Sequence, residues 1–325
     1  MSKYINKVCL VALMSSLSMS ALAQWPDRPI KIVVPFKAGG STDLVARSFS
    51  AAIAEQNLLD QPLSIVNVGG HSSVGARRVM DAKSDGYEFL LHETGLIGAN
   101  AAGIIDFGPN DYKPVAATGS ICMALMVRKD SGYNSLPDLV SAAKKQPGEI
   151  VFGVNLGGLN HMSGILLENA TDTKFRFVQI GGSADNFAAL TGGQTAVASV
   201  GAAGARNFTM TKEGKLSDAS QVKTIALLAK TPHPRLPGVP TAIEQGANAE
   251  FCFTNYWFAP KDTPDAIVAK FASVLEKAAE SDRIKKFYAD TLSTPVFLKA
   301  SDFEKHLKET AVSIGPIAKQ ALQKK

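Results

Sequence analysis

The hydrophobic pattern of the chain repeats one unit: a short apolar run, a turn that contains glycine, and an amphipathic helical stretch. In the opening unit, Ile30–Val34 is typical of a buried strand, and Gly39-Gly40 follows it. After these glycines, Ser41 can cap a helix whose inward face is apolar. Alternating strands and helices of this kind predict an α/β protein with mostly parallel sheets that are covered on both faces.

Further units of this kind extend over the rest of the chain. Apolar runs predict strands at residues 63–68, 87–91, 115–127, 150–154, 175–180, 195–200, 222–228 and 251–259. Helices are predicted over 136–146, after Pro264, and after the glycine turns at 69–75, 157–160 and 181–185. The segment 231–240 holds four prolines and is predicted to be an ordered loop.

The first 23 residues form a separate segment. Lys3 and Lys7 precede an apolar stretch, and Ala21-Leu22-Ala23 follows as an A-x-A cleavage site, which is the pattern of a secretory signal peptide. No later segment approaches the roughly 20 apolar residues of a membrane-spanning helix. We therefore expect cleavage after about Ala23 and a soluble exported protein that begins near Gln24. The remaining chain of about 300 residues is long enough for two domains.

Charge and cysteine content narrow the choice of partners and compartment. Loss of the first segment removes two lysines and no acidic residue, so the formal net charge falls from +5 to about +3. No run of Lys and Arg is present, which argues against a nucleic-acid partner. Two cysteines remain, Cys122 and Cys252, each among apolar residues. An exported protein can join such a pair in a disulfide, but the sequence favours two small buried hydrophobic residues.

The sequence carries no complete motif of an enzyme or a metal site. Residues 71–75 and 181–185 resemble the G-x-S-x-G nucleophile elbow, but each lacks one of its two glycines. Five histidines could supply a base, but the sequence places no partner beside any of them. There is no H-E-x-x-H, no paired C-x-x-C, no Walker lysine and no G-x-G-x-x-G after the first strand. Catalytic residues, metal ligands and cofactors are therefore not expected.

What remains is a set of glycine turns rich in hydroxyl and amide side chains, at residues 39–42, 157–160 and 181–183. A strand, a glycine turn and a helix N-terminus together present free backbone N–H groups and a helix dipole that favours an anion. Such turns can hold an oxyanion without a catalytic base, as a receptor for a carboxylate requires. Asp43, in the first turn of the first helix, either stabilises the helix dipole, orients the turn, or accepts a hydrogen bond from the ligand.

A series of short motifs runs along the mature chain. In order, the main ones are Trp25-Pro26-Asp27-Arg28-Pro29-Ile30, Val33-Val34-Pro35-Phe36, Gly39-Gly40-Ser41-Thr42-Asp43, Asp85-Gly86-Tyr87, Leu136-Pro137-Asp138-Leu139, Asn160-His161-Met162, Leu190-Thr191-Gly192-Gly193-Gln194, Arg235-Leu236-Pro237-Gly238-Val239-Pro240 and Trp257-Phe258-Ala259-Pro260. This ordered set resembles the substrate-binding proteins of tripartite tricarboxylate transporters. The resemblance implies a two-lobed fold of the type II periplasmic-binding-protein class, with the ligand in the cleft between the lobes.

The resemblance also implies a function and a site. It implies a periplasmic, monomeric receptor without cofactor or metal that captures a small organic carboxylate for integral membrane permease subunits. The implied ligand-binding residues are Phe36, Lys37, Ala38, Gly39, Gly40, Ser41, Thr42, Asp43, Glu93, Thr94, Asn155, Gly157, Gly158, Asn160, His161, Gly181, Gly182, Ser183 and Gly201. Lys37 stands where the family usually has proline, and a cation at the mouth of the pocket favours a dianionic ligand.

The lobe boundaries and two other functions are also matters of expectation. Lobe one is expected over residues 24–122 and again over 254–325, and lobe two over 123–253. The last helices are expected to pack on lobe one. The same lobes would serve a ligand sensor that docks on a signalling partner instead of a permease. A secreted α/β hydrolase is a further alternative, which would need His71 or His161 for turnover.

Overall fold

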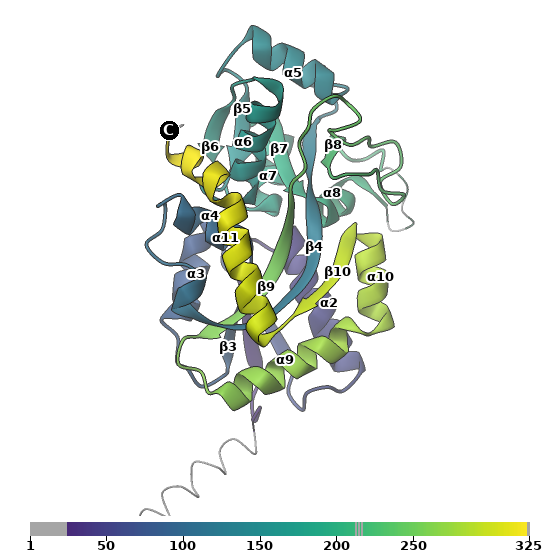
Figure 1. Cartoon of the computed structure of the whole chain (residues 1–325). Helices are drawn as coiled ribbons and strands as arrows, with labels where there is room; N and C mark the ends of the chain where they lie inside the picture. The colour runs from purple at the N-terminus through teal and green to yellow at the C-terminus, as the bar shows by residue number, and fades with distance from the viewer. Residues whose placement is uncertain (1–24, 212, 214, 216, 324–325) are drawn as a thin grey trace, which may run out of the picture.

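One long strand, β4 (Tyr112–Arg128), passes from one half of the molecule to the other in the computed structural model (Figure 1). The structure describes residues 25–323 apart from 212, 214 and 216, so the predicted signal peptide of residues 1–23 lies outside the described part. The other strands are β1 (Ile30–Val34), β2 (Leu63–Asn67), β3 (Glu88–Glu93), β5 (Val151–Val154), β6 (Arg176–Gln179), β7 (Val197–Gly201), β8 (Val222–Leu228), β9 (Cys252–Pro260) and β10 (Ser293–Leu298).

Strand β4 is shared by two sheets. Its residues 112–122 lie antiparallel to β9 and β10, and β9 continues the sheet through β3, β1 and β2. Its residues 123–128 lie antiparallel to β7 and β8, and β7 continues into the parallel strands β5 and β6. Each sheet with its helices forms one lobe, so the two-lobed α/β fold expected from the sequence is confirmed. The exact lobe boundaries stay a prediction. The change of strand partners within β4 after residue 122 agrees with them.

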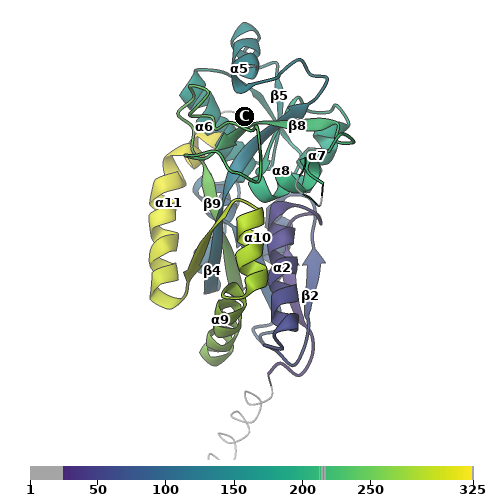
Figure 2. The ribbon, with the colours of Figure 1, turned by 90° about the vertical axis from the view of Figure 1, so that its right-hand side faces the viewer.

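Helices flank both sheets. They are α2 (Ser41–Glu55), α3 (Ser72–Met80), α4 (Gly95–Ala101), the 3-10 turn η1 (Pro109–Asp111), α5 (Leu136–Lys145), α6 (Leu159–Thr171), α7 (Ser183–Thr191), α8 (Ala202–Thr209), α9 (Asp265–Ala279), α10 (Asp282–Asp290) and α11 (Ala300–Gln323). Helices α2, α9 and α10 lie side by side on the first lobe, and α5 to α8 surround the second (Figure 2).

The sequence predicts that the last helices pack on lobe one, but the last of them extends beyond that lobe. Helix α11 runs along both lobes and contacts α4 of the first and α6 of the second (Figures 1 and 2). Near its end, Asn169 Nδ2 of α6 donates a hydrogen bond to Gln320 Oε1 at 3.1 Å. The lobes are therefore connected by β4, by β9 and by the packing of α11.

The first helix begins one residue before the position expected from the sequence. Gly40, in extended backbone, is the N-cap of α2, and no side chain caps this end. Ser41 is instead the first helical residue, and its Oγ bonds to backbone groups of the second lobe. The inward face is apolar as predicted, with Val45 and Phe49 buried.

The apolar runs of β4 and β9 form the centre of the core. Almost every residue of β9 is buried, because helices cover both faces of the sheet at this point. Trp257 contacts Phe49 of α2 and Phe271 of α9 in edge-to-face geometry, and its Nε1 donates to Thr118 Oγ1 at 2.8 Å. Both strands that link the lobes are thus anchored in lobe one.

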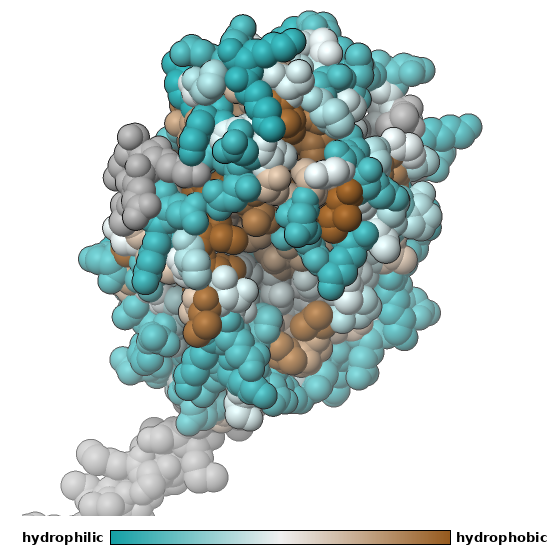
Figure 3. All heavy atoms as spheres, turned by 45° about the horizontal axis from the view of Figure 1, so that its top comes forward, coloured by the Kyte–Doolittle hydropathy of each residue, from teal (hydrophilic) through white to brown (hydrophobic). Residues whose placement is uncertain are grey.

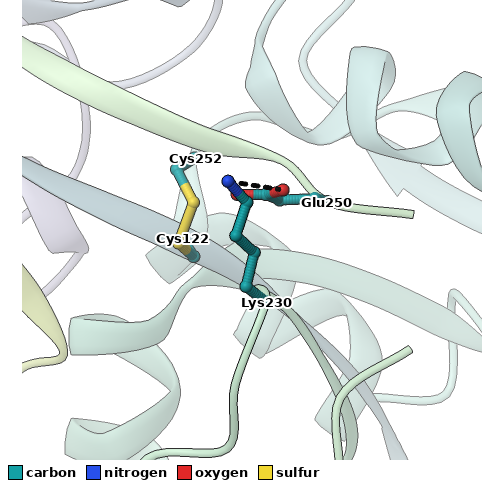
Figure 4. Close-up of a disulfide and its surroundings, with 4 residues drawn as sticks. All are labelled: Cys122, Lys230, Glu250 and Cys252. Carbon is teal, nitrogen blue, oxygen red and sulfur yellow. Dashed lines mark ion pairs between the residues drawn. A yellow bond between two sulfur atoms is a disulfide. The ribbon is translucent and has the colours of Figure 1, made fainter. Parts of the chain in front are cut away.

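The interpretation of the two cysteines as unpaired buried residues is wrong, because Cys122 and Cys252 form a disulfide (Figure 4). The two residues are direct partners in the antiparallel pairing of β4 with β9, which places their side chains together. The sequence separation of 130 residues hides this pairing from local pattern analysis. The bond joins the two linking strands where β4 changes from one sheet to the other.

Few large apolar side chains are exposed in the described part of the chain. The face shown in Figure 3 is mainly hydrophilic, with brown apolar residues scattered between polar ones. Among the described residues, Val74 and Val312 are the most exposed large hydrophobic side chains, at 58% and 79%. Single exposed residues of this kind are usual in globular proteins. Within the described ranges, every helix is too short or too polar to traverse a bilayer.

Candidate functional site

Four helices begin at one cavity between the lobes. The cavity is small, with about 30 Å³ of space for the centre of a water-sized molecule. Its lining is Phe36, Gly40, Ser41, Thr42, Glu93, Met123, Asn155, Leu159, Asn160, Gly182, Ser183, Ser199, Gly201 and Phe253. The helices are α2, α6, α7 and α8, with the N-cap glycines 40, 158, 182 and 201. Each cap has extended backbone and no capping side chain. The N–H of Gly204 in α8 bonds to Ser41 Oγ and that of His161 in α6 to Asn160 Oδ1, and the other N–H groups at these helix starts are left for other acceptors. These N-termini favour an anion.

Asp43 holds the loop before α2 in shape. Gly39 adopts a φ of +86°, and its N–H donates to Asp43 Oδ2 at 2.8 Å. Arg47 Nε donates to the same oxygen at 2.8 Å, and Asn67 Nδ2 donates to Oδ1 at 3.0 Å. Both carboxylate oxygens are therefore occupied, and the side chain is buried. Of the three roles that the sequence left open, these contacts favour orientation of the turn.

Two asparagines tie the loops of the second lobe together. Asn160 Oδ1 accepts the N–H of Asn155 at 2.8 Å, and Asn160 Nδ2 donates to the carbonyl of Gly181 at 3.0 Å. Asn186 Nδ2 donates to the carbonyls of Gly181 and Gly182 at 2.7 and 3.1 Å. The loops after β5 and β6 are thereby fixed to each other, and the N-termini of α6 and α7 face the cavity together.

The lobes meet directly around the cavity. Ser41 Oγ donates to the carbonyl of Gly201 at 3.3 Å and accepts the N–H of Gly204 at 3.2 Å. On the other side of the cleft, His71 Nε2 lies 3.0 Å from the carbonyl oxygen of Leu156. Since each contact joins the first lobe to the second, the cavity is held between lobes that touch on both sides.

Glu93 brings the single ionisable side chain to the described cavity lining. It ends β3 and is 4% exposed. Burial raises the pKa of the Glu93 carboxyl to about 8, although a hydrogen bond from the N–H of Gly95 acts in the opposite direction. Its neighbour His92 is also buried, which lowers the pKa of that imidazole to about 3. At neutral pH, therefore, both side chains are mainly uncharged.

The predicted site residues fall into two groups. Those that line the cavity are Phe36, Gly40, Ser41, Thr42, Glu93, Asn155, Asn160, Gly182, Ser183 and Gly201. Those that lie outside its lining are Lys37, Ala38, Gly39, Asp43, Thr94, Gly157, Gly158, His161 and Gly181. Members of the second group support the first: Thr94 Oγ1 donates to Tyr256 at 3.2 Å, and His161 Nδ1 accepts the N–H of Gly157 at 3.1 Å. Contact with a ligand stays a prediction for all of them.

Sequence reasoning missed four lining residues: Met123, Leu159, Ser199 and Phe253. Met123 and Phe253 follow the disulfide cysteines, where β4 and β9 pass between the lobes. Ser199 is on β7, and its Oγ accepts from Ser163 Oγ at 2.7 Å. The signal available in the sequence was the pair of predicted lobe boundaries, after residues 122 and 253, because a segment that crosses between lobes must pass the cleft.

None of the histidines in the described part of the chain lines the cavity. Among the same residues, no cluster of three or more His, Cys, Asp or Glu side chains has the arrangement of a metal site. The chemistry that the lining offers is hydrogen bonding from backbone N–H groups, hydroxyls and amides.

Comparisons with known proteins agree with this geometry. The family described as "Tripartite tricarboxylate transporter family receptor" matches residues 45–322. A UPF0065 protein from the ttuE–ttuC′ intergenic region of Agrobacterium vitis is 30% identical over 303 residues, which cover 90% of this chain and 84% of that protein.

Two solved structures from Rhodopseudomonas palustris are also similar. MatC, with bound malate, is 25% identical with a TM-score of 0.78, and the match covers 90% of this chain and all of MatC. A second protein, with adipate, is 26% identical with a TM-score of 0.81, over 91% of this chain and 98% of its own. The chain therefore belongs to the tripartite tricarboxylate transporter receptors, a family of periplasmic solute-binding proteins.

Proposed function

We propose that this protein captures a small organic carboxylate in the cavity between its lobes. The observation that carries the proposal is the meeting of four helix N-termini without capping side chains at one cavity. Backbone N–H groups and helix dipoles there compensate a carboxylate. Neither Lys nor Arg is among the described lining residues, so the negative charge of the ligand is met by the backbone and by hydroxyl groups.

The related structures support the choice of ligand class. MatC and the second R. palustris protein are described with malate and with adipate, and both compounds are small dicarboxylates. A ligand with two carboxylates matches donors on both sides of the cavity, since Thr42 comes from the first lobe and Ser183 from the second. Each carboxylate would then be held by one lobe, and the ligand would favour the arrangement in which the lobes touch.

We further propose that the receptor works as a monomer in the periplasm and delivers its ligand to integral membrane permease subunits. Membership in the family and the predicted signal peptide support this location. The disulfide between Cys122 and Cys252 suits an oxidising compartment. Mass spectrometry of the exported protein tests the location, with a mature N-terminus at about Gln24 as the expected result. An unprocessed chain in the cytoplasm would contradict it.

A thermal-shift screen tests the ligand class. The panel contains malate, adipate, succinate, citrate, benzoate and aspartate, and a ligand at about 100 times its Kd stabilises the protein by about 2.7 kcal/mol. We expect at least one carboxylate to raise the Tm clearly. If no carboxylate in the panel changes the Tm, the proposed ligand class is wrong.

A double variant locates the binding in the cavity. Thr42→Val together with Ser183→Ala removes one hydroxyl from each lobe. A hydrogen bond to a charged group contributes about 1.5–3 kcal/mol, so we expect roughly 100-fold weaker binding or more. Ser48→Ala, on the same helix α2 but outside the cavity lining, is the matched control and should bind as the unaltered protein does. Equal affinities for the double variant and the control would place the ligand elsewhere.

A further inference from the structure

Glu93 is an unusual residue for a site that binds anions. It is a buried carboxyl group in the lining of the cavity, and the other lining residues of the described part carry no ionisable side chain. A receptor that compensated its ligand only with backbone N–H groups would gain nothing from a negative charge there. The position of Glu93 therefore requires a separate explanation.

The contacts of Glu93 leave one carboxyl oxygen without a partner. Oε2 accepts the N–H of Gly95 at the start of α4. Residue 95 has no room for a side chain, because an added Cβ would lie 2.6 Å from the same oxygen. Oε1 lies 3.8 Å from Nδ1 of His92, which is too far for a hydrogen bond. Within the described residues no hydrogen bond reaches Oε1. One oxygen is thus fixed on the backbone, and the other can bond to a molecule in the cavity.

Among the residues that the structure describes, no charged cation pairs with this carboxyl group. His92 is adjacent but buried and neutral. Tyr256 of β9 bonds to Thr94 and to His306 of α11, and burial raises the pKa of its hydroxyl. At the rim, Lys37 of the loop before α2 is already paired with Asp185 of α7.

The two histidines on neighbouring helices are engaged elsewhere. His71 of α3 contacts Leu156, and His161 of α6 bonds to the N–H of Gly157. Among the described residues, His92 is the one basic side chain within 4.0 Å of the Glu93 carboxyl group, and its imidazole is neutral. An ionised Glu93 would thus be stabilised mainly by the N–H of Gly95.

A bound carboxylate and Glu93 would share one small cavity. Two carboxylates in contact inside a desolvated cavity do not both stay ionised, because their repulsion raises the pKa of one of them strongly. The two groups instead share one proton in a short hydrogen bond. The position of Glu93 and the negative charge of the ligand are sufficient to lead to this shared proton.

We propose that Glu93 binds the ligand as a neutral carboxylic acid and donates a hydrogen bond to one of its carboxylate groups. The inference rests on the proposed function and specifies it further. The ligand presents an acceptor, and not an ammonium group, to this side of the cavity. When Glu93 is ionised in the free protein, binding takes up one proton from solution, which goes to the hydrogen bond between Glu93 and the ligand. Burial, which raises the pKa of Glu93 to about 8, supports this protonation state.

The test is isothermal titration calorimetry between about pH 7 and 9.5. In this range dicarboxylates stay dianionic, His92 with its lowered pKa stays neutral, and Tyr256 with its raised pKa stays protonated. Malate and adipate are the first probes, and the carboxylate with the largest thermal shift replaces them if it binds more tightly. For the unaltered protein we expect a Kd that is constant near pH 7 and rises about tenfold per pH unit above about pH 8. Titrations in buffers of different ionisation enthalpy should show proton uptake over the same range.

Two variants complete the design. Glu93→Gln keeps a donor at the same place without a titratable group, so its Kd should stay within about threefold of the unaltered value at pH 7 and should not change with pH. Glu88→Gln, on the same strand but outside the cavity lining, is the matched control and should keep the original pH dependence. If Glu93→Gln does not fold, the slope of the unaltered protein still decides the question.

Three results would overturn the inference while leaving the proposed function intact. The first is carboxylate binding with a Kd that does not change between pH 7 and 9.5. The second is a loss of more than about tenfold in Glu93→Gln at pH 7. The third is aspartate that binds more tightly than malate and gains affinity as the pH rises, which would mean that ionised Glu93 holds an ammonium group. If no carboxylate binds at any pH, the proposed function fails, and the inference fails with it.

Discussion

Lys37 of the first lobe forms an ion pair with Asp185 of the second lobe, with 2.5 Å between Nζ and Oδ1. The lysine side chain is 63% exposed and the aspartate side chain 8% exposed. The hydrogen bond and charge of Asp185 raise the pKa of Lys37 above its ordinary value. The pair lies at the rim of the cavity and joins the two lobes. It gives Lys37 a role that the sequence did not predict, as a contact across the cleft.

We expect this ion pair to affect mainly the rate at which the ligand leaves. Lys37→Met should raise the dissociation rate by about threefold or more and leave the association rate nearly unchanged, because the pair forms only when the lobes touch. Lys31→Met, another exposed lysine with an acidic neighbour on the same lobe, is the control. Stopped-flow measurements check both rates. In an Asp185→Asn background, a further effect of Lys37→Met on dissociation would show that the pair is not the cause.

The space left by the missing side chain at Gly201 is expected to be required for closure against Ser41. A Cβ at Gly201 would lie 2.4 Å from Ser41 Oγ and 2.9 Å from its Cβ. Gly201→Ala should therefore hold the lobes apart and weaken carboxylate binding by about tenfold or more, since only the closed fraction binds tightly. Gly315→Ala, with no atom near the added Cβ, is the control. Calorimetry checks the affinities.

A second substitution tests whether the clash with Ser41 is the cause of weaker binding in Gly201→Ala. Removing the Ser41 side chain in Ser41→Gly takes away the two nearest atoms that the new methyl group would meet and leaves Phe253 Cζ, at 3.1 Å. The double variant Ser41→Gly with Gly201→Ala should therefore bind more tightly than Gly201→Ala alone. If it binds as weakly or more weakly, closure is not limited by this contact.

Stability of the ligand-free protein should fall on both sides of a plateau between about pH 4.5 and 6.5. Burial raises the pKa of Glu93 from 4.5 to about 8, so its neutral form stabilises the fold below pH 4.5 and this contribution is lost as the pH rises to 8. Burial lowers the pKa of His92 from 6.5 to about 3, so its contribution is present above pH 6.5 and is lost as the pH falls to 3. Within the plateau the two slopes oppose each other.

A separate variant tests the loss of stability on each side of the plateau. Glu93→Gln should remove most of the loss between pH 6.5 and 8, and His92→Asn most of the loss between pH 4.5 and 3. One pH unit at full slope corresponds to about 1.4 kcal/mol, so the loss over each of these intervals of about 1.5 pH units amounts to about 2 kcal/mol. Urea unfolding at a series of pH values measures the free energy directly. A Glu93→Gln profile parallel to that of the unaltered protein above pH 6.5 would contradict the assignment.

The disulfide between Cys122 and Cys252 should stabilise the fold without being needed for binding. It closes a loop with a sequence separation of 130 residues that contains most of the second lobe. Replacing both cysteines by alanine should lower the free energy of unfolding by about 2–4 kcal/mol and change the Kd for a carboxylate by less than about threefold. Chemical denaturation and calorimetry measure these quantities. Two thiols that react freely in the native exported protein would show that the bond is absent.

Local patterns were sufficient to find the loops of the site. The apolar run before Gly39, and those before Gly157 and Gly181, predicted strand ends followed by helix N-termini, and these elements do meet at one cavity. This works because the strand, the turn and the helix each have a signature within a few residues. The short helices α4 and α8 lack such a signature and were missed, as was strand β10 in a tail that was predicted to be helical.

Contacts between distant residues could not be predicted in the same way. The Cys122–Cys252 bond, the Lys37–Asp185 pair and the bonds of Ser41 to lobe two depend on strand register and on how the lobes meet. The hydrophobic pattern of one segment contains no information on these relations. For the same reason, Met123 and Phe253 were recognised as part of a crossing between lobes but not as cavity residues.

A crystal structure with the carboxylate of highest affinity tests the central claim most directly. We predict one ligand molecule between the lobes, with carboxylate oxygens within hydrogen-bonding distance of N–H or hydroxyl groups at Thr42 and at Ser183, and with Glu93 Oε1 beside a ligand oxygen. A ligand bound outside this cavity, or one whose carboxylates contact none of the helix N-termini of α2, α6, α7 and α8, would contradict the account.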